Sequence, residues 1–402
     1  MTSTIHSVGI DLHDRFLSAL RTVLPVKTAI ALHEPEFAGN EWAYVKECID
    51  TGWVSSVGKY VDEFERRLVE VTGSRFAVAT VNGTAALHVA LKLAGVESGD
   101  EVIVPALSFV ATANAVAYCG AVPHFVDSAE DTLGLCPRAL RNHLNNSTEP
   151  TGGKTRNKQT GRRIAAVVPM HAFGHPADLD GLMAVARDFH LPLVEDAAES
   201  LGSTYQGRHT GTFGLLAALS FNGNKIITTG GGGAILTQDD TLARHAKHLT
   251  TTAKRPHRWE FFHDEVAWNY RLPNINAALG CAQLERLTDF IARKRTLAHR
   301  YRDTFSIVPE VRFADEPVSC RSNFWLNTIV LNSASAALRD ELLAVSNNAG
   351  FMTRPAWTLL HRLPMFAACP HAPLPVAEKL EASLINLPSS PSLAESGGKT
   401  ST

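Results

Sequence analysis

The chain has 402 residues, of which 45% are apolar and 19% are charged, and its formal net charge at pH 7 is -2. This is the composition of a globular chain long enough for two domains with a sizeable core. The balanced charge provides no strong attraction to nucleic acid or to an anionic membrane, so neither is expected as a partner.

The first residues carry early acidic side chains and no long apolar run, which predicts neither a signal peptide nor a membrane span. The six cysteines are scattered without a CxxC pair. They indicate reduced thiols, and hence a cytoplasmic protein without a disulfide framework or a zinc site.

In chain order, the first expected element is a helix at about 12–24, inside an N-terminal extension. Two further helices are expected at 41–49 and 60–69. Between them, residues 51–58 (TGWVSSVG) form an extended or looping stretch with small polar groups. This stretch either lines a cleft or simply connects the two helices.

From residue 76 onward, short apolar strands alternate with helical patterns. The alternation predicts an α/β protein with a mostly parallel central sheet and helices on both faces. In such sheets, ligands bind outside the carboxyl ends of the strands. The candidates that follow directly after predicted strands are Gly83, Thr84, Phe109, His171, Asp196 and Ser220.

The segment Asn82-Gly83-Thr84 follows the strand 76–81 and precedes a helix. The free N–H groups and the dipole of a helix N-terminus favour an anion at this position. Neither a GxGxxG pattern nor a Walker lysine is present, so a single phosphate monoester fits better than a dinucleotide or ATP. The alternative is that Thr84 merely caps the helix.

The most informative stretch is 220–236, where Lys225 lies in a short apolar segment followed by four glycines. Upstream, the acidic pair Glu195-Asp196 closes a buried strand. A lysine that forms a Schiff base and an aspartate that keeps a pyridine nitrogen protonated are two parts of a pyridoxal phosphate (PLP) enzyme. Each signal alone has an ordinary explanation, namely a surface charge, a strand end or a flexible turn. Together and in this order they favour a PLP site.

Two other patterns are interpreted as non-catalytic. His171 and His175 have the spacing of helical metal ligands, but Gly174 and Pro176 argue against a helix, so no metal site is expected. The polar, basic segment 145–163 is predicted to be a mobile surface loop.

The second half of the chain is expected to continue with a polar loop at 251–265 and a long amphipathic helix at about 275–305. A second, smaller domain holds a strand at 324–331 and a helix at 335–348. The aromatic and basic segment 354–362 could meet an anionic substrate or be a solvated loop. The predicted division of the chain is an N-terminal helical extension (1–30), a large domain (31–274), a small domain (275–388) and a disordered tail (389–402).

Over residues 31–387 the chain resembles the DegT/DnrJ/StrS family of PLP-dependent sugar aminotransferases, which have the aspartate aminotransferase fold (fold type I). The motifs that carry the resemblance are TGWVSSVGKYVDEFE, NGTAALHVAL, PALSFVATANAV, VEDAAESLGS, SFNGNKIITTGGGGAIL and WNYRLPNINAALG. The resemblance implies a mostly parallel central sheet flanked by helices and a smaller C-terminal α+β domain.

The resemblance also implies a role for each matched residue. Lys225 would carry the cofactor, and Asp196 would hold the pyridinium nitrogen. Glu199 would lie near the ring hydroxyl, at a position where many relatives carry Gln. The remaining implied contacts are phosphate binding by Gly83, Thr84 and Ser220, ring stacking by Phe109, a contact of Asn269 with the phosphate of a neighbouring subunit, and sugar-nucleotide contacts by Trp53, Ser55, Ser56, His361 and the loop 251–265.

Within the family, the amino-acid sequence of these motifs is most similar to that of the branch that aminates C4 of nucleotide-linked 4-keto-6-deoxy-2-acetamido sugars. The implied activity is transfer of the amino group of L-glutamate to such a UDP- or GDP-linked sugar, by a homodimer with shared active sites. Three alternatives remain open: a PLP-dependent sugar dehydratase, an NAD-dependent oxidoreductase and a catalytically silent PLP-fold regulator. Dehydratase relatives carry His in place of Lys225, and the oxidoreductase needs a dinucleotide fingerprint that the sequence lacks.

Overall fold

The computed structural model describes residues 3–25 and 27–395 of the chain. Its centre is a sheet built from two ladders, β1-β11-β10-β7 and β3-β2-β6. Parallel bridges Val167↔Leu193 and Met170↔Asp196 join β6 to β7, so the two ladders form one continuous surface. All pairs in it are parallel except those of β11 with β10 and β1. The predicted mostly parallel sheet is therefore confirmed.

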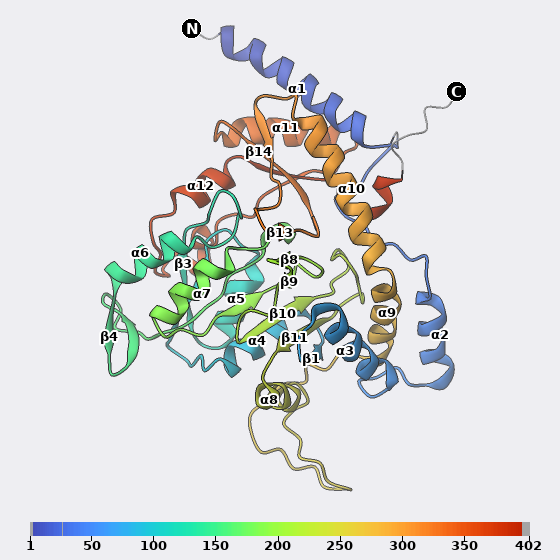
Figure 1. Cartoon of the computed structure of the whole chain (residues 1–402), viewed down its shortest axis with the longest axis vertical. Coiled ribbons are helices and arrows are strands. Elements are labelled where there is room, and N and C mark those ends of the chain that lie inside the picture. The colour runs from blue at the N-terminus through green and yellow to red at the C-terminus, as the bar shows by residue number, and fades with distance from the viewer. Residues whose placement is uncertain (1–2, 26, 396–402) are drawn as a thin grey trace.

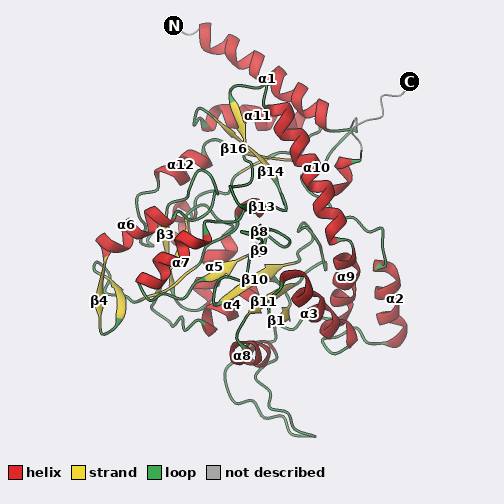
Figure 2. Cartoon of the chain, in the orientation of Figure 1, coloured by secondary structure: helices red, strands yellow, loops and turns green. Residues whose placement is uncertain are grey.

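The strands of this sheet are short and buried because helices cover both faces (Figures 1 and 2). The strands are β1 (Phe76–Thr80), β2 (Glu101–Pro105), β3 (Val122–Val126), β6 (Ile164–Val167), β7 (Val194–Asp196), β10 (Leu216–Ser220) and β11 (Gly233–Thr237). The surrounding helices are α2 (Glu41–Thr51), α3 (Lys59–Thr72), α4 (Gly83–Leu93), α5 (Val110–Tyr118), α6 (Pro137–Ser147), α7 (Leu179–Asp188), α8 (Asp240–Thr250) and α9 (Asn274–Glu285).

A second sheet, in the order β12-β14-β16-β15, is antiparallel and lies in the C-terminal part of the chain. Its elements are β12 (Val311–Phe313), β14 (Asn327–Leu331), α11 (Ala336–Asn348), β15 (Arg354–Pro355), α12 (Pro375–Glu381) and β16 (Leu384–Leu387). A small ladder of β13 (Cys320–Arg321), β8 (Thr204–Tyr205) and β9 (Arg208–His209) lies between the two sheets. The predicted α+β C-terminal part is confirmed, and the predicted boundary between residues 274 and 275 stays a prediction.

The N-terminal helix α1 (Ser3–Val23) begins earlier than predicted and lies across α10 and α11 at one end of the molecule (Figure 1). Its apolar stripe, represented by Phe16 and Leu20, is fully buried against Tyr301 and Phe305 of α10. The extension is therefore an integral part of the C-terminal core.

Two further sequence predictions need correction. The segment 145–163 is not an irregular loop, since it contains the antiparallel hairpin β4 (Thr148–Thr151) and β5 (Lys154–Asn157). Glu101 holds the hairpin by accepting hydrogen bonds from Asn157 (2.8 Å) and Thr160 (2.5 Å). The single long helix predicted at 275–305 is divided at Arg286 into α9 and α10 (Leu287–Phe305).

The predicted disordered tail is wrong for residues 389–395, and residues 396–402 lie outside the described part of the chain. Short helix η4 (Pro391–Ala394) packs on α10, and Leu393 is 3% exposed. The tail also accepts a hydrogen bond at the carbonyl of Ser389 from the buried Lys294. The Ser- and Pro-rich composition indicated disorder, but Leu393 and Ala394 provide enough apolar surface to anchor the segment.

Among residues 3–25 and 27–395, no helix is long and apolar enough to cross a membrane.

The anchored tail leads to a stability prediction. Leu393→Ala should lower the free energy of unfolding by about 2–4 kcal/mol, since it leaves a cavity between η4 and α10. The measurement is the urea midpoint, followed by circular dichroism. Leu393→Met, which conserves volume, is the matched control and should cost much less. An unchanged midpoint for Leu393→Ala would mean that the tail does not contribute to the fold.

Candidate active site

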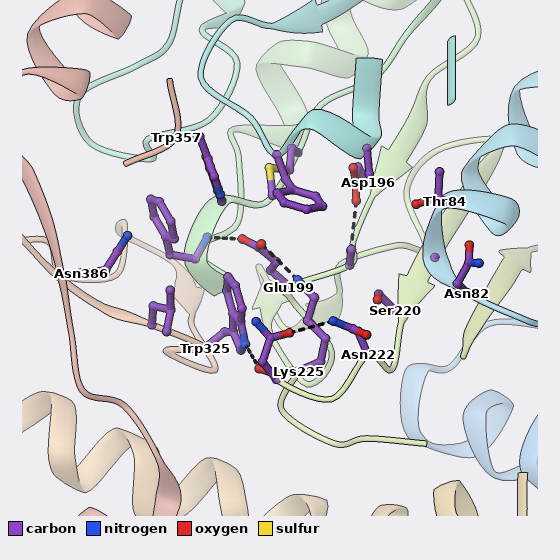
Figure 3. A pocket seen from close by; sticks show the side chains of 18 of the residues that line it. Asn82, Thr84, Asp196, Glu199, Ser220, Asn222, Lys225, Trp325, Trp357 and Asn386 are labelled. Carbon is purple, nitrogen blue, oxygen red and sulfur yellow. Dashed lines mark hydrogen bonds and ion pairs between the residues drawn. The ribbon is translucent and has the colours of Figure 1, made fainter. Parts of the chain in front are cut away.

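A cavity of about 540 Å³ opens at the carboxyl edge of the central sheet (Figure 3). This volume lies in the usual range for small-molecule sites. Its walls come from both parts of the chain, because segments after β1, β7 and β10 meet the loop before β14 and strand β15. The predicted residues that line it are Gly83, Thr84, Phe109, Asp196, Glu199, Ser220 and Lys225.

Asp196 is the last residue of β7, and it is 5% exposed. Its Oδ2 accepts a hydrogen bond from the Thr112 hydroxyl (2.7 Å), and its Oδ1 accepts one from the amide of Ala198 (3.2 Å). Burial raises the pKa of Asp196, although these hydrogen bonds and the charge of Lys225 oppose that rise. A cationic N–H beside this carboxyl group would favour its ionised form.

The Lys225 side chain reaches the same cavity from the loop after β10, with 11% of its surface exposed. Its Nζ lies 3.1 Å from Oε1 of Glu199 and 4.0 Å from the centroid of the Trp325 ring. Trp325 is itself fixed, because its Nε1 donates to the carbonyl of Asn224 (2.7 Å). The amine is therefore held between a carboxylate and an aromatic face.

The helix α4 begins beside the end of β10, and we call the residues that meet there, Gly83, Thr84 and Ser220, the anion cradle. The amides of Gly83 and Thr84 belong to the first turn of α4, where amides have no partner within the helix. A Cβ at Gly83 would lie 2.8 Å from Cβ of Ser220, so only glycine allows this close approach. Gly233 is required for a similar reason, since a Cβ there would lie 2.4 Å from the carbonyl carbon of Asn82.

The helix cap at this cradle is Asn82, whose side chain accepts from the amide of Ala85 (2.8 Å). The alternative in which Thr84 merely caps α4 is therefore wrong. The Thr84 side chain lines the cavity instead.

Aromatic side chains form the wall that faces the second sheet. Phe173 and Trp357 stack at 4.6 Å with 17° between their planes. Phe109 is 47% exposed and meets the edge of Trp357 at 6.5 Å. The cavity thus offers a flat apolar surface opposite the polar groups of the sheet edge.

The remaining predicted contacts do not line this cavity in one chain. Trp53 belongs to a separate cavity of about 420 Å³ beside α2 and α3, and Ser55 and Ser56 lie in the same loop. Asn274 holds this loop, since its side-chain amide donates to the carbonyl of Trp53 (2.7 Å) and its backbone amide donates to that of Ser55 (2.6 Å).

Asn269 is exposed, and its side chain accepts a hydrogen bond from Arg271 (2.9 Å). The loop 251–265 projects from the body beyond α8 and exposes Trp259, Phe261 and Phe262 (Figure 1). His361 lies beside His371, with 5.1 Å between ring centroids, and its buried Nδ1 has no hydrogen-bond partner among residues 3–25 and 27–395. The contacts assigned to these residues stay predictions.

Several residues of the cavity were missed from the sequence. Trp357 and Arg354 belong to the aromatic and basic segment 354–362, from which the family resemblance implies only His361 as a contact. Three asparagines of the cavity lie inside the motifs given above, close in sequence to Thr84 or Lys225: Asn82, Asn222 and Asn224. Their closeness to these two residues in the sequence could have predicted that they line the site. Phe173, Trp325 and Asn386 gave no local signal, because tertiary packing alone brings them to the cavity.

Glu195, the neighbour of Asp196, is fully buried and faces away from the cavity. Its carboxylate accepts hydrogen bonds from the amides of Gly211, Phe213 and Gly214, at 2.7, 2.8 and 2.7 Å. His171 lies 3.0 Å away through its Nε2. Burial alone would raise the pKa of Glu195, but the His171 contact and the backbone amides outweigh it and lower that pKa.

These residues fit PLP. The cradle at Gly83 and Ser220 has room and donors for a phosphate, Asp196 is a buried anion partner for a ring nitrogen, and Lys225 provides the amine for an aldehyde. A mostly parallel sheet with such groups at its carboxyl edge defines the class: a PLP-dependent transferase of fold type I.

Comparisons with known proteins identify the family. The DegT/DnrJ/EryC1/StrS aminotransferase family matches residues 35–398, and the chain belongs to it. The chain is 37% identical over 365 residues to the GDP-perosamine synthase of Escherichia coli O157:H7, covering 91% of this chain and 94% of that protein. It is 38% identical over 338 residues to the putative pyridoxal phosphate-dependent aminotransferase EpsN of Bacillus subtilis (strain 168), covering 84% of both.

Among solved structures, the aminotransferase TlmJ from Streptoalloteichus hindustanus is 30% identical, with a TM-score of 0.82 over 92% of this chain and 95% of that one. The protein is therefore a PLP-dependent aminotransferase, and the sequence predictions of its fold, its cofactor and its enzyme class are confirmed.

The Glu195 network gives a pH-dependent stability prediction. Glu195→Gln should cost about 3 kcal/mol at pH 7, because a neutral amide cannot accept from three amides and His171 at once. Since folding lowers the pKa of Glu195 below its ordinary 4.5, its contribution is complete above that value and is lost as the pH falls through the folded-state pKa. The measurement is urea unfolding of both proteins between neutral and acid pH. A difference that stays constant with pH would contradict the assignment.

Proposed function

We propose that the protein transfers the amino group of L-glutamate to C4 of a nucleotide-linked 4-keto-6-deoxy hexose, for surface glycan biosynthesis. The observation that carries the proposal is the convergence of Lys225 and Asp196 on one cavity, with Glu199 on the lysine (Figure 3). Relatives named GDP-perosamine synthase support a nucleotide-linked sugar and favour GDP as the carrier. The 2-acetamido group and a UDP carrier are suggested by the sequence motifs alone.

When bound, PLP supplies an aldehyde that carries the amino group and a ring that delocalises the electrons left when a proton leaves carbon. Lys225 would hold the aldehyde and then, as a free amine, move the proton between the substrate and cofactor carbons. Asp196 would stabilise the positive charge on the ring nitrogen, since an anion there favours the protonated ring. The amides at Gly83 and Thr84 and the hydroxyl of Ser220 would bind the phosphate.

The proposed active unit is a homodimer with shared active sites. The aromatic side chains exposed on the loop 251–265 are consistent with a surface that a second copy covers. Asn269 and the loop that carries Trp53, Ser55 and Ser56 lie away from the cavity of their own chain. Their predicted contacts with phosphate and sugar nucleotide are therefore proposed to reach the neighbouring subunit's cavity.

The direct test incubates the protein with PLP, L-glutamate and a panel of UDP- and GDP-linked 4-keto sugars, with and without the 2-acetamido group. Mass spectrometry should detect conversion of ketone to amine, and the protein should be yellow. Lys225→Ala should lose both, with turnover reduced by about a thousandfold or more, whereas the exposed Lys158→Ala should lose neither. No conversion of any 4-keto sugar would refute the proposal. Dehydration of the sugar instead would favour the dehydratase alternative, and a yellow but inert protein would favour the regulator.

Arg354 gives a second prediction for the sugar nucleotide. It lines the cavity and forms no ion pair within the described part of the chain, and its Nη1 is anchored on Asn347 (3.0 Å) and on the carbonyl of Thr353 (2.8 Å). The remaining N–H groups are available for a diphosphate. Arg354→Gln should raise KM for the sugar nucleotide by about tenfold or more, the worth of one charge-assisted hydrogen bond.

The matched control is Arg362→Gln, because Arg362 lies on the same segment but is paired with Glu378 and Glu381 outside the cavity. Steady-state kinetics with the sugar nucleotide as the varied substrate separates the two variants. Equal KM values for Arg354→Gln and the wild type would exclude Arg354 from diphosphate binding.

A further inference from the structure

The cavity contains two buried carboxyl groups, and the proposed chemistry uses only one of them on the ring nitrogen. Glu199 is 3% exposed, and both of its oxygens are engaged. Oε2 accepts from the amide of Phe173 (2.9 Å), and Oε1 lies 3.1 Å from Nζ of Lys225 (Figure 3). Asp196 forms no hydrogen bond with Lys225 among the described residues, since its oxygens are taken by Thr112 and Ala198.

We propose that Glu199 is the proton partner of Lys225, an inference that rests on the proposed function. Each time Lys225 must act as a nucleophile or base, its ammonium N–H bond breaks and an O–H bond forms at Oε1 of Glu199. The electron pair of that N–H bond stays on Nζ, which becomes a free amine. The proton returns to Nζ when Lys225 is charged again, so no further reactant is needed.

The geometry suits this exchange. Donor and acceptor are within hydrogen-bond distance, and the amide of Phe173 keeps the carboxyl group from rotating away. Burial raises the pKa of Glu199, opposed by the charge of Lys225 and the two hydrogen bonds and assisted by the charge of Asp196. A raised pKa makes the protonated carboxyl easier to reach than it would be in a solvent-exposed glutamate.

Other ring and charged groups also act on Lys225 and Glu199. Lys225 also faces the ring of Trp325. Burial lowers the pKa of His33, and the charges of Lys294 and Lys225 lower it further. The charge of Asp196 also acts on Glu199. Within the described chain, Glu199 is therefore the carboxyl group in contact with the reacting amine.

A purely structural role is the competing explanation, because Glu199 also helps to hold the wall of the cavity. Phe173 has a positive φ of 57°, an uncommon conformation for a non-glycine residue, and it stacks on Trp357. Glu199→Gln separates the two roles. The amide oxygen of Gln can still accept from Phe173, but the side chain has neither the charge nor the capacity to take a proton.

The test compares holoenzymes of wild type and Glu199→Gln. An anion beside the nitrogen of Lys225 favours its protonated state, so its loss should lower the midpoint of the pH titration of the bound cofactor's visible absorbance by about one unit or more. The half reaction with L-glutamate, followed by stopped-flow absorbance, should slow by about a hundredfold at pH 7 and gain a steeper dependence on pH. Bound PLP per chain and the thermal midpoint should stay at wild-type values.

The surface variant Glu130→Gln is the matched control, since Glu130 pairs with Lys379 away from the cavity. An unchanged absorbance midpoint and pH profile in Glu199→Gln would overturn the proton-partner role. That result would leave the proposed function intact if the wild type still aminates a 4-keto sugar. If the wild type binds PLP and reacts with glutamate but aminates no sugar, the proposed function is refuted. The role of Glu199 would then still be decided by the absorbance midpoint and the glutamate half reaction.

Discussion

The parallel pairing of β7 with β10 is the constraint on which the site depends. Its register sets Ala218 beside Asp196, so the acid at the end of β7 and the segment that carries Lys225 leave the sheet at the same edge. The antiparallel strand β11 then returns Gly233 against the backbone of Asn82 and Gly83, which places the start of α4 beside Ser220. Two hydrogen-bonded ladders thus bring a lysine, a carboxylate and an anion cradle to one cavity.

Burial determines the electrostatics of this edge. Glu195 and Asp196 are consecutive, but one is surrounded by backbone amides and His171, and the other by a hydroxyl and one amide. Burial is the largest influence on both, yet folding lowers the pKa of Glu195 and raises that of Asp196. The number of donors around each carboxyl group accounts for the difference. The result is a structural acid whose ionised form folding favours, next to an acid whose ionised form burial disfavours.

The C-terminal part of the chain completes the cavity from the other side. Trp325 supports the amine of Lys225, and the buried Lys294 of α10 donates to the carbonyl of Trp325 (3.1 Å) and to that of Ser389. Burial keeps the pKa of Lys294 well below its usual value. The tail, α10 and the loop of Trp325 are therefore joined at one point behind the reactive lysine, which makes Ser389 part of the site's support.

The amino-acid sequence alone determined the fold class and the cofactor. It also singled out Lys225, Asp196, Gly83, Thr84 and Ser220 as site candidates, and the structure brings them to one cavity. The reason is that strand-and-helix periodicity and the short motifs at strand ends are local properties. Only the tertiary structure decided that Trp325, Phe173 and Trp357 wall the cavity, since their segments come together through long-range packing. It also showed that residues 389–395 are anchored and that 148–157 form a hairpin, because Leu393 and Glu101 find partners far away in the chain. Composition cannot reveal such contacts, and this is why it predicted a disordered tail at 389–395 and a mobile loop at 145–163.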